Sequence, residues 1–104
     1  MIRKAFVLQL KPGCQQEYKR RHNTIWPELQ QVLREHGVHS YSIFLDSTTD
    51  RLFGYVEIEN EERWKAVGQT AIGQKWRRHM SDILVTNPDN SPVSTVLQEV
   101  FHLD

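Results

Sequence analysis

Residues 38–59, with the sequence VHSYSIFLDSTTDRLFGYVEIE, form the stretch on which the fold depends. Tyr41, Ile43 and Leu45 stand two residues apart in its first half, so they would share one face of a strand. The mostly polar tract from Ser47 to Asp50 is typical of a turn, and RLFGYVEIE after it has the composition of a strand. The stretch therefore predicts two strands joined as a hairpin.

A helical pattern leads into this hairpin. Gly37 suits the left-handed position that ends a helix, and the side chains before it recur at helical spacing: Leu29, Val32, Leu33 and His36. Pro27 would lie in the first turn of this helix, where it removes no hydrogen bond, with Thr24 as the N-cap. Residues 15–23 contain no helix breaker, so we expect a first helix there and a kink at residues 23–26.

Two more helical segments follow the hairpin. Asn60 is a good N-cap for the first, in which Trp64 and Val67 would form the buried stripe. After a break near Gly68, Thr70 can cap the second, whose apolar positions are Ile72, Trp76, Met80 and Ile83.

Strands are expected at both ends of the chain. Residues 2–10 would be apolar on both faces of a strand, with Phe6, Leu8 and Leu10 on one side and Ala5 and Val7 on the other. Residues 85–94 are rich in Pro, Asn, Asp and Ser and predict a loop. The last strand would cover residues 96–103, with alternating apolar positions at Leu97, Phe101 and Leu103.

The resulting order, β-α-β-β-α-β, predicts an α+β fold of the ferredoxin-like type, a single domain over residues 1–104. Its helices would cover one face of an antiparallel sheet. Because the first strand is apolar on both sides, we expect the other face to be buried against a second copy, which makes a homodimeric α/β barrel. Residues on the open face or on the first helix could line a pocket near the rim of that barrel.

Composition narrows the class of ligand and the compartment. Thirteen basic and thirteen acidic residues cancel, which argues against nucleic acid or an anionic membrane and favours a neutral small molecule. No apolar run is long enough to span a bilayer. The single cysteine, Cys14, cannot form an internal disulfide, and no secretory leader precedes the first strand, so we expect a cytoplasmic protein.

Tyr18 and His22 are the first candidates for chemistry. Standing at i and i+4, they would project from one face of the first helix, with Arg21 beside them. A histidine can give and take a proton near neutrality, and a tyrosine adds a hydroxyl on an apolar ring. The alternative is a solvated surface pair, and the spacing alone does not decide between the two.

Aromatic residues supply further candidates. Trp76 precedes the polar run Arg77–His79 and is the better ligand candidate, whereas Trp64 is predicted to be core packing. The Tyr41 hydroxyl needs a partner in a pocket or in the core, and both readings stand. The histidines lack the spacing of a metal site, and neither a glycine-rich phosphate loop nor a GxSxG elbow is present.

Four blocks of the sequence resemble the L-rhamnose mutarotase family: EYKRRHNTIWPEL (17–29), VEIENEERW (56–64), NPDNSPVS (87–94) and LQEVF (97–101). The resemblance runs essentially from end to end. It implies a homodimeric ferredoxin-like protein that interconverts the α and β anomers of L-rhamnose without a cofactor.

Position by position, the resemblance makes His22 the proton donor and Tyr18, Tyr41 and Trp76 substrate contacts. The family usually has a second aromatic residue after this tryptophan, where the present chain has Arg77. A planar guanidinium can stack on a sugar ring or donate to its hydroxyls, so we expect Arg77 to replace that contact.

The base for the reaction is left open by the sequence: Tyr18, a carboxylate or an ordered water could serve. Two other functions also remain, a dimeric α/β-barrel monooxygenase and a non-catalytic sugar-binding dimer, because the fold alone does not separate them. Asn87, Asp89 and Asn90 could bind sugar hydroxyls, although a proline-stiffened connection is the preferred reading of residues 87–92.

Overall fold

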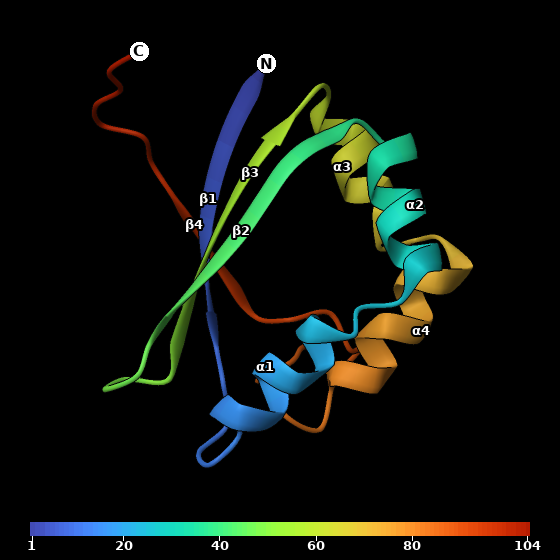
Figure 1. Cartoon of the computed structure of the whole chain (residues 1–104), viewed down its shortest axis with the longest axis vertical. Coiled ribbons are helices and arrows are strands. Elements are labelled where there is room, and N and C mark those ends of the chain that lie inside the picture. Colours follow the sequence, from blue (N-terminus) through green and yellow to red (C-terminus); the bar gives the residue numbers. More distant parts are fainter.

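The computed structural model describes residues 1–104 and has the predicted order, with each helical region divided in two (Figure 1). The elements are β1 (Ile2–Gln9), α1 (Gln15–Asn23), α2 (Pro27–Glu35), β2 (Val38–Asp46), β3 (Arg51–Ile58), α3 (Glu61–Val67), α4 (Ala71–Met80) and β4 (Ser94–Leu97). None of these helices is long and apolar enough to cross a membrane.

The four strands form one antiparallel sheet in the order β2-β3-β1-β4, which is the ferredoxin-like arrangement. The hairpin pairs Leu45 with Leu52, and its turn is fixed by Asp46, whose carboxylate accepts hydrogen bonds from the backbone N–H and the hydroxyl of Thr48. Ile43 pairs with Gly54 and Tyr41 with Val56, which confirms that the alternating residues of β2 share one face.

The break between α1 and α2 occurs where the sequence predicts it, but its capping differs. Pro27 is the first residue of α2 and Trp26 is the N-cap, without a side-chain hydrogen bond. The prediction that Thr24 caps this helix is wrong, because the Thr24 hydroxyl donates back to the carbonyl of Arg20 in α1. Gly37 ends the region with φ of 82°, as expected for a left-handed stop.

The caps of α3 and α4 follow the prediction. The Asn60 side chain accepts from the backbone N–H of Arg63, and the Thr70 hydroxyl accepts from that of Gly73. Helix α4 ends at Met80, so Ile83 lies in the following turn instead of on the helix, although it is buried there.

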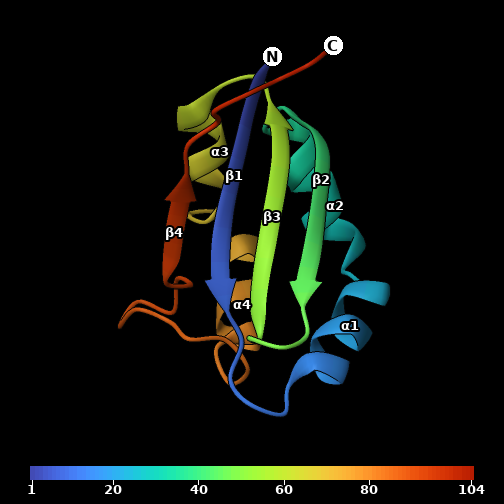
Figure 2. The same ribbon diagram turned by 90° about the vertical axis from the view of Figure 1, so that its left-hand side faces the viewer.

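All four helices lie on one face of the sheet, and the other face is bare (Figures 1 and 2). The main core lies between the two layers and comprises Leu8, Leu10, Tyr18, Leu52, Met80, Ile83 and Leu84. A second, smaller cluster joins Val38, Val56 and Ile58. The main core, to which Tyr18 and Met80 both belong, holds α1 and α4 over the same end of the sheet.

The last strand is shorter than predicted. Strand β4 covers only Ser94–Leu97 and pairs with Ala5–Leu8 at the sheet edge, after which the chain leaves the sheet (Figure 2). Phe101 and Leu103 are therefore 78% and 79% exposed instead of forming an alternating strand face. The alternation is present in the sequence, but the backbone pairing with β1 ends at Leu97. Beyond Leu97 the tail is joined to β1 by side-chain hydrogen bonds from Arg3 to Glu99, at 2.8 and 3.2 Å.

Candidate active site

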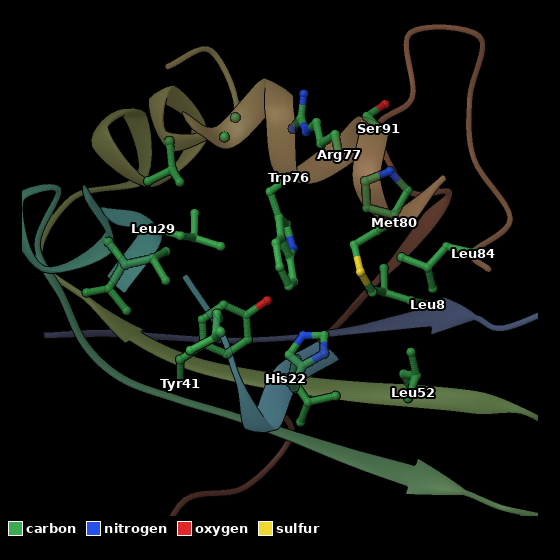
Figure 3. Close-up of a pocket in the computed structure, with 18 of the residues that line it drawn as sticks. Leu8, His22, Leu29, Tyr41, Leu52, Trp76, Arg77, Met80, Leu84 and Ser91 are labelled. Atoms are coloured by element: carbon green, nitrogen blue, oxygen red, sulfur yellow. The ribbon is translucent and has the colours of Figure 1, made fainter. Parts of the chain in front are cut away.

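A cavity of about 1090 Å³ lies between the helix-covered face of the sheet and the helices (Figure 3). Helix α1 supplies Tyr18 and His22, strand β2 supplies Tyr41, and helix α4 supplies Trp76 and Arg77. The five residues singled out in the sequence thus line one cavity within a single chain. The expectation that residues of the first helix could line a pocket is met by Tyr18 and His22. The open face of the sheet supplies none of the five, because Tyr41 lies on the helix-covered face.

His22 is fixed by its own helix. Its ring stacks on Tyr18 with centroids 4.1 Å apart and planes at 26°, as the i, i+4 spacing allows. Nδ1 of His22 lies 3.0 Å from the backbone carbonyl oxygen of Tyr18. Burial lowers the pKa of His22 below its ordinary value, and the hydrogen bond to this carbonyl opposes that shift in part.

Trp76 of helix α4 contacts the pair formed by Tyr18 and His22. Its ring meets His22 edge to face, with centroids 5.4 Å apart and planes at 86°. In Figure 3 the Trp76 side chain points from α4 towards Tyr41 and His22. The rings of Trp76 and Tyr41 and the imidazole of His22 therefore meet around one space, although α4, β2 and α1 are far apart in the sequence.

Tyr41 closes the opposite side of the cavity. Its ring packs edge to face against Phe6 at 6.2 Å and Trp64 at 5.6 Å. Although 38% of the residue is exposed, its hydroxyl end lies at the cavity, where burial raises its pKa to about 12. The hydroxyl makes no hydrogen bond within the chain, so it is free to meet a ligand.

Arg77 also lines the cavity, at the side of Ser91 (Figure 3). Its guanidinium lies over the Cα of Gly68, so closely that a Cβ there would overlap it. Unlike Arg3 and Arg21, the other half-buried arginines, Arg77 has no carboxylate within ion-pair distance. Its donors therefore remain available to a ligand.

The loop after α4 forms part of the same wall. Asp89, Asn90 and Ser91 line the cavity, whereas Asn87 does not. One carboxylate oxygen of Asp89 accepts hydrogen bonds from the backbone N–H and the hydroxyl of Ser91, at 3.0 and 2.5 Å. The Asn87 side chain also donates to Ser91, so the loop is stiffened from within while it borders the cavity.

Arg21 ties α1 to the end of α4. Its guanidinium forms two hydrogen bonds with the carboxylate of Asp82, at 2.9 and 3.1 Å, and one with the carbonyl of His79 at 2.7 Å. Its Nε donates to Glu17 at 2.7 Å. Hydrogen bonds from Arg20 and Arg21 lower the pKa of Glu17 to about 2. This network holds the helices of His22 and Trp76 against each other.

Two tryptophans have roles that the sequence does not reveal. The prediction of core packing for Trp64 is incomplete, because this residue is half-buried and lines the cavity beside Tyr41. Trp26 lies behind Trp76, with ring centroids 5.0 Å apart and planes at 85°, and supports that ring without lining the cavity. The only signal for Trp26 in the sequence is its place at the kink.

No three His, Cys, Asp or Glu side chains are grouped so as to hold a metal ion.

Comparison with known proteins adds the family. A family model described as L-rhamnose mutarotase matches residues 3–103. A relative from Pectobacterium carotovorum with that name is 58% identical, and one from Yersinia pestis is 61% identical, each over the whole of both chains. The crystal structure of an L-rhamnose mutarotase from Formosa agariphila superposes with a TM-score of 0.92, at 42% identity and with full coverage of both chains.

More distant structures share the fold alone. A putative antibiotic biosynthesis monooxygenase from Nitrosomonas europaea is 16% identical, with a TM-score of 0.65 over 97% of this chain and 100% of its own. A dimeric ferredoxin-like protein from an uncultured marine organism is 10% identical, with a TM-score of 0.66 over 98% and 96% of the two chains. At this identity the likeness says nothing about the reaction.

Proposed function

The chain belongs to the L-rhamnose mutarotase family, and we propose that it interconverts the α and β anomers of L-rhamnose. The observation that carries the proposal is the position of His22, whose ring lies between the Tyr18 and Trp76 rings at the wall of a cavity large enough for a monosaccharide. A titratable group enclosed by aromatic faces suits a sugar that must be bound and protonated in one place.

Anomer exchange needs only proton transfers. The ring oxygen must gain a proton and the anomeric hydroxyl must lose one, after which the ring opens, the aldehyde rotates and the ring closes on the other face. His22 donates the proton to the ring oxygen. Because the hemiacetal already opens slowly in water, a modest reduction of the barrier is sufficient, and positioning at a small site can supply it.

The other site residues bind the sugar. The Trp76 ring offers an apolar surface to the C–H bonds of the pyranose, and the free hydroxyl of Tyr41 offers one hydrogen bond. Tyr18 contacts the sugar only with the part of its side chain that lines the cavity, because its ring is stacked on His22. Arg77 donates to hydroxyls at the side of the cavity where the polar loop lies, because its guanidinium has no carboxylate partner in the chain. This cavity therefore combines an aromatic wall with a cationic one.

The exchange of L-rhamnose anomers can be measured directly by saturation transfer between the two anomeric protons in a proton NMR spectrum. The purified chain should transfer saturation at concentrations where buffer alone does not. A panel of other aldoses would define its specificity. A chain that binds L-rhamnose without raising the exchange rate would be a sugar-binding protein instead, and the proposal would be wrong.

We also propose that two copies pack through the bare face of the sheet. Val7, Phe53 and Tyr55 lie on this face, and Leu97 extends it on β4 with 40% of its surface exposed. The tail after β4 adds three exposed apolar residues, Val100, Phe101 and Leu103. The ferredoxin-like protein from the marine organism is dimeric, which agrees with this assembly.

We further propose that the protein is located in the cytoplasm.

A further inference from the structure

The hydrogen bond of His22 fixes which ring nitrogen carries a proton. Nδ1 lies 3.0 Å from the carbonyl oxygen of Tyr18, and a carbonyl oxygen can only accept. Nδ1 therefore bears hydrogen in both charge states of the ring. When His22 is neutral, the remaining nitrogen, Nε2, presents a lone pair, so the neutral ring acts as a base at that atom.

The surroundings favour this neutral state. His22 is enclosed by the Tyr18 and Trp76 rings, no carboxylate pairs with it, and burial lowers its pKa. Arg21, next in sequence, directs its charge to Asp82 and Glu17. The cations that line the cavity offer His22 no counter-charge: Lys19 of α1, Arg34 of α2, Lys65 of α3 and Arg77 of α4.

The rest of the cavity wall offers no comparable base. Burial raises the pKa values of Tyr18 and Tyr41, so both hydroxyls stay protonated near neutrality. His39 lies at the surface end of the cavity, where its Nε2 is hydrogen-bonded to the carboxylate of Glu59, which accepts. Asp89 is the one carboxylate at the cavity, and its Oδ1 already accepts two hydrogen bonds from Ser91, which lower its pKa and weaken it as a base.

We propose that Nε2 of His22 is both the base and the acid of the reaction: it removes the proton of the anomeric hydroxyl and returns the same proton to the ring oxygen. This inference rests on the proposed mutarotase function and names the source of the proton that His22 donates. Both oxygens are bonded to the anomeric carbon, so one nitrogen within hydrogen-bond reach of one can reach the other after a small rotation of the sugar.

The step balances without another reactant. Nε2 takes the hydroxyl proton, the electron pair of that O–H bond forms the carbonyl, and the bond from the anomeric carbon to the ring oxygen breaks with its pair on that oxygen. The ring oxygen then takes the proton from Nε2, and His22 is neutral again. Closure on the opposite face runs the same transfers in reverse.

The pH dependence of anomer exchange tests this assignment, with the spontaneous rate subtracted at each pH. If neutral His22 is the reactive form, kcat/KM should fall about tenfold per pH unit below the pKa of His22 and stay level above it. A rate that falls as the pH rises through that pKa would overturn the proposal, because it would make protonated His22 the resting acid.

Asp89→Asn is the matched variant for a second base. Whatever its rate, this variant should show the fall of kcat/KM at low pH that the wild type shows, at the same pH. If that fall at low pH disappeared in the variant, the base would be Asp89. Nitrogen NMR of labelled His22 adds a readout independent of activity: the neutral ring should carry its proton on Nδ1, and a proton on Nε2 would refute the inference. A protein that shows this tautomer but exchanges no anomers at any pH would refute the proposed function instead.

Discussion

A methyl group added at Gly68 would test the role of Arg77 without altering Arg77 itself. Gly68 has φ of −68° and ψ of −14°, a conformation that alanine adopts readily, so the backbone should accept the change. The new Cβ would overlap the guanidinium of Arg77, with even the more distant Nη1 only 2.9 Å away. The guanidinium is the far end of a flexible side chain, so it should swing away and leave the fold intact.

The expected loss is one of sugar binding. A hydrogen bond from a charged donor contributes about 1.5–3 kcal/mol, so displacing Arg77 should lower kcat/KM for L-rhamnose by about 10- to 150-fold. The melting temperature should not fall, since Gly→Ala at a compatible site stabilises by about 0.4–1 kcal/mol. Arg77→Ala should give a similar loss, and the double variant should lose little more, because both changes remove the same contact.

Arg78→Ala is the matched control. Arg78 does not line the sugar cavity, so its removal should leave kcat/KM unchanged although it also deletes an arginine from α4. The assay is anomer exchange measured over a range of L-rhamnose concentrations. A Gly68→Ala enzyme that keeps wild-type kcat/KM while Arg77→Ala loses tenfold would refute the reasoning, because the present position of the guanidinium would then be irrelevant to binding.

Three other predictions concern the supports of the site. Trp26→Leu should lower kcat/KM by several-fold because Trp76 loses the edge-to-face contact with Trp26, and a wild-type value would show that Trp76 holds its place without Trp26. The pKa of Glu17 is about 2 in the folded chain and 4.5 is its ordinary value, so its contribution to stability is complete above about pH 4.5 and is lost as the pH falls towards 2. Glu17→Gln should therefore reduce the fall of the melting temperature over that pH range. An unchanged dependence of the melting temperature on pH would contradict the pairing of Glu17 with Arg20 and Arg21. Phe53→Lys on the bare sheet face should convert a dimer to a monomer in analytical ultracentrifugation, and a persistent dimer would exclude this face as the interface.

The parts of the fold that depend on local signals could be predicted from the sequence. Helix α1 and strand β2 have the predicted bounds, because residues 15–23 contain no helix breaker and β2 lies between the stop at Gly37 and the polar turn at residues 47–50. Strand β4 could not be delimited in this way. Its length depends on how much of the edge of β1 the returning chain reaches, and the sequence after Leu97 keeps its alternation without a partner strand.

The site shows the same division. The shared face of Tyr18 and His22 follows from helix geometry alone, so the sequence suffices to pair them. The arrival of Trp76 beside them depends on how α4 packs over the sheet, and the lining role of Trp64 depends on its contact with Tyr41. Such contacts between distant elements are decided by packing, which residue spacing does not encode.

The most direct test of the central claim is saturation transfer between the anomeric protons of L-rhamnose, recorded with the wild-type chain and with His22→Gln at equal concentration. Circular dichroism would verify that both are folded. The wild type should transfer saturation well above the buffer rate. His22→Gln keeps a polar side chain but cannot relay a proton near neutral pH, so its exchange should return to the buffer rate. Exchange by His22→Gln at the wild-type rate would contradict the account.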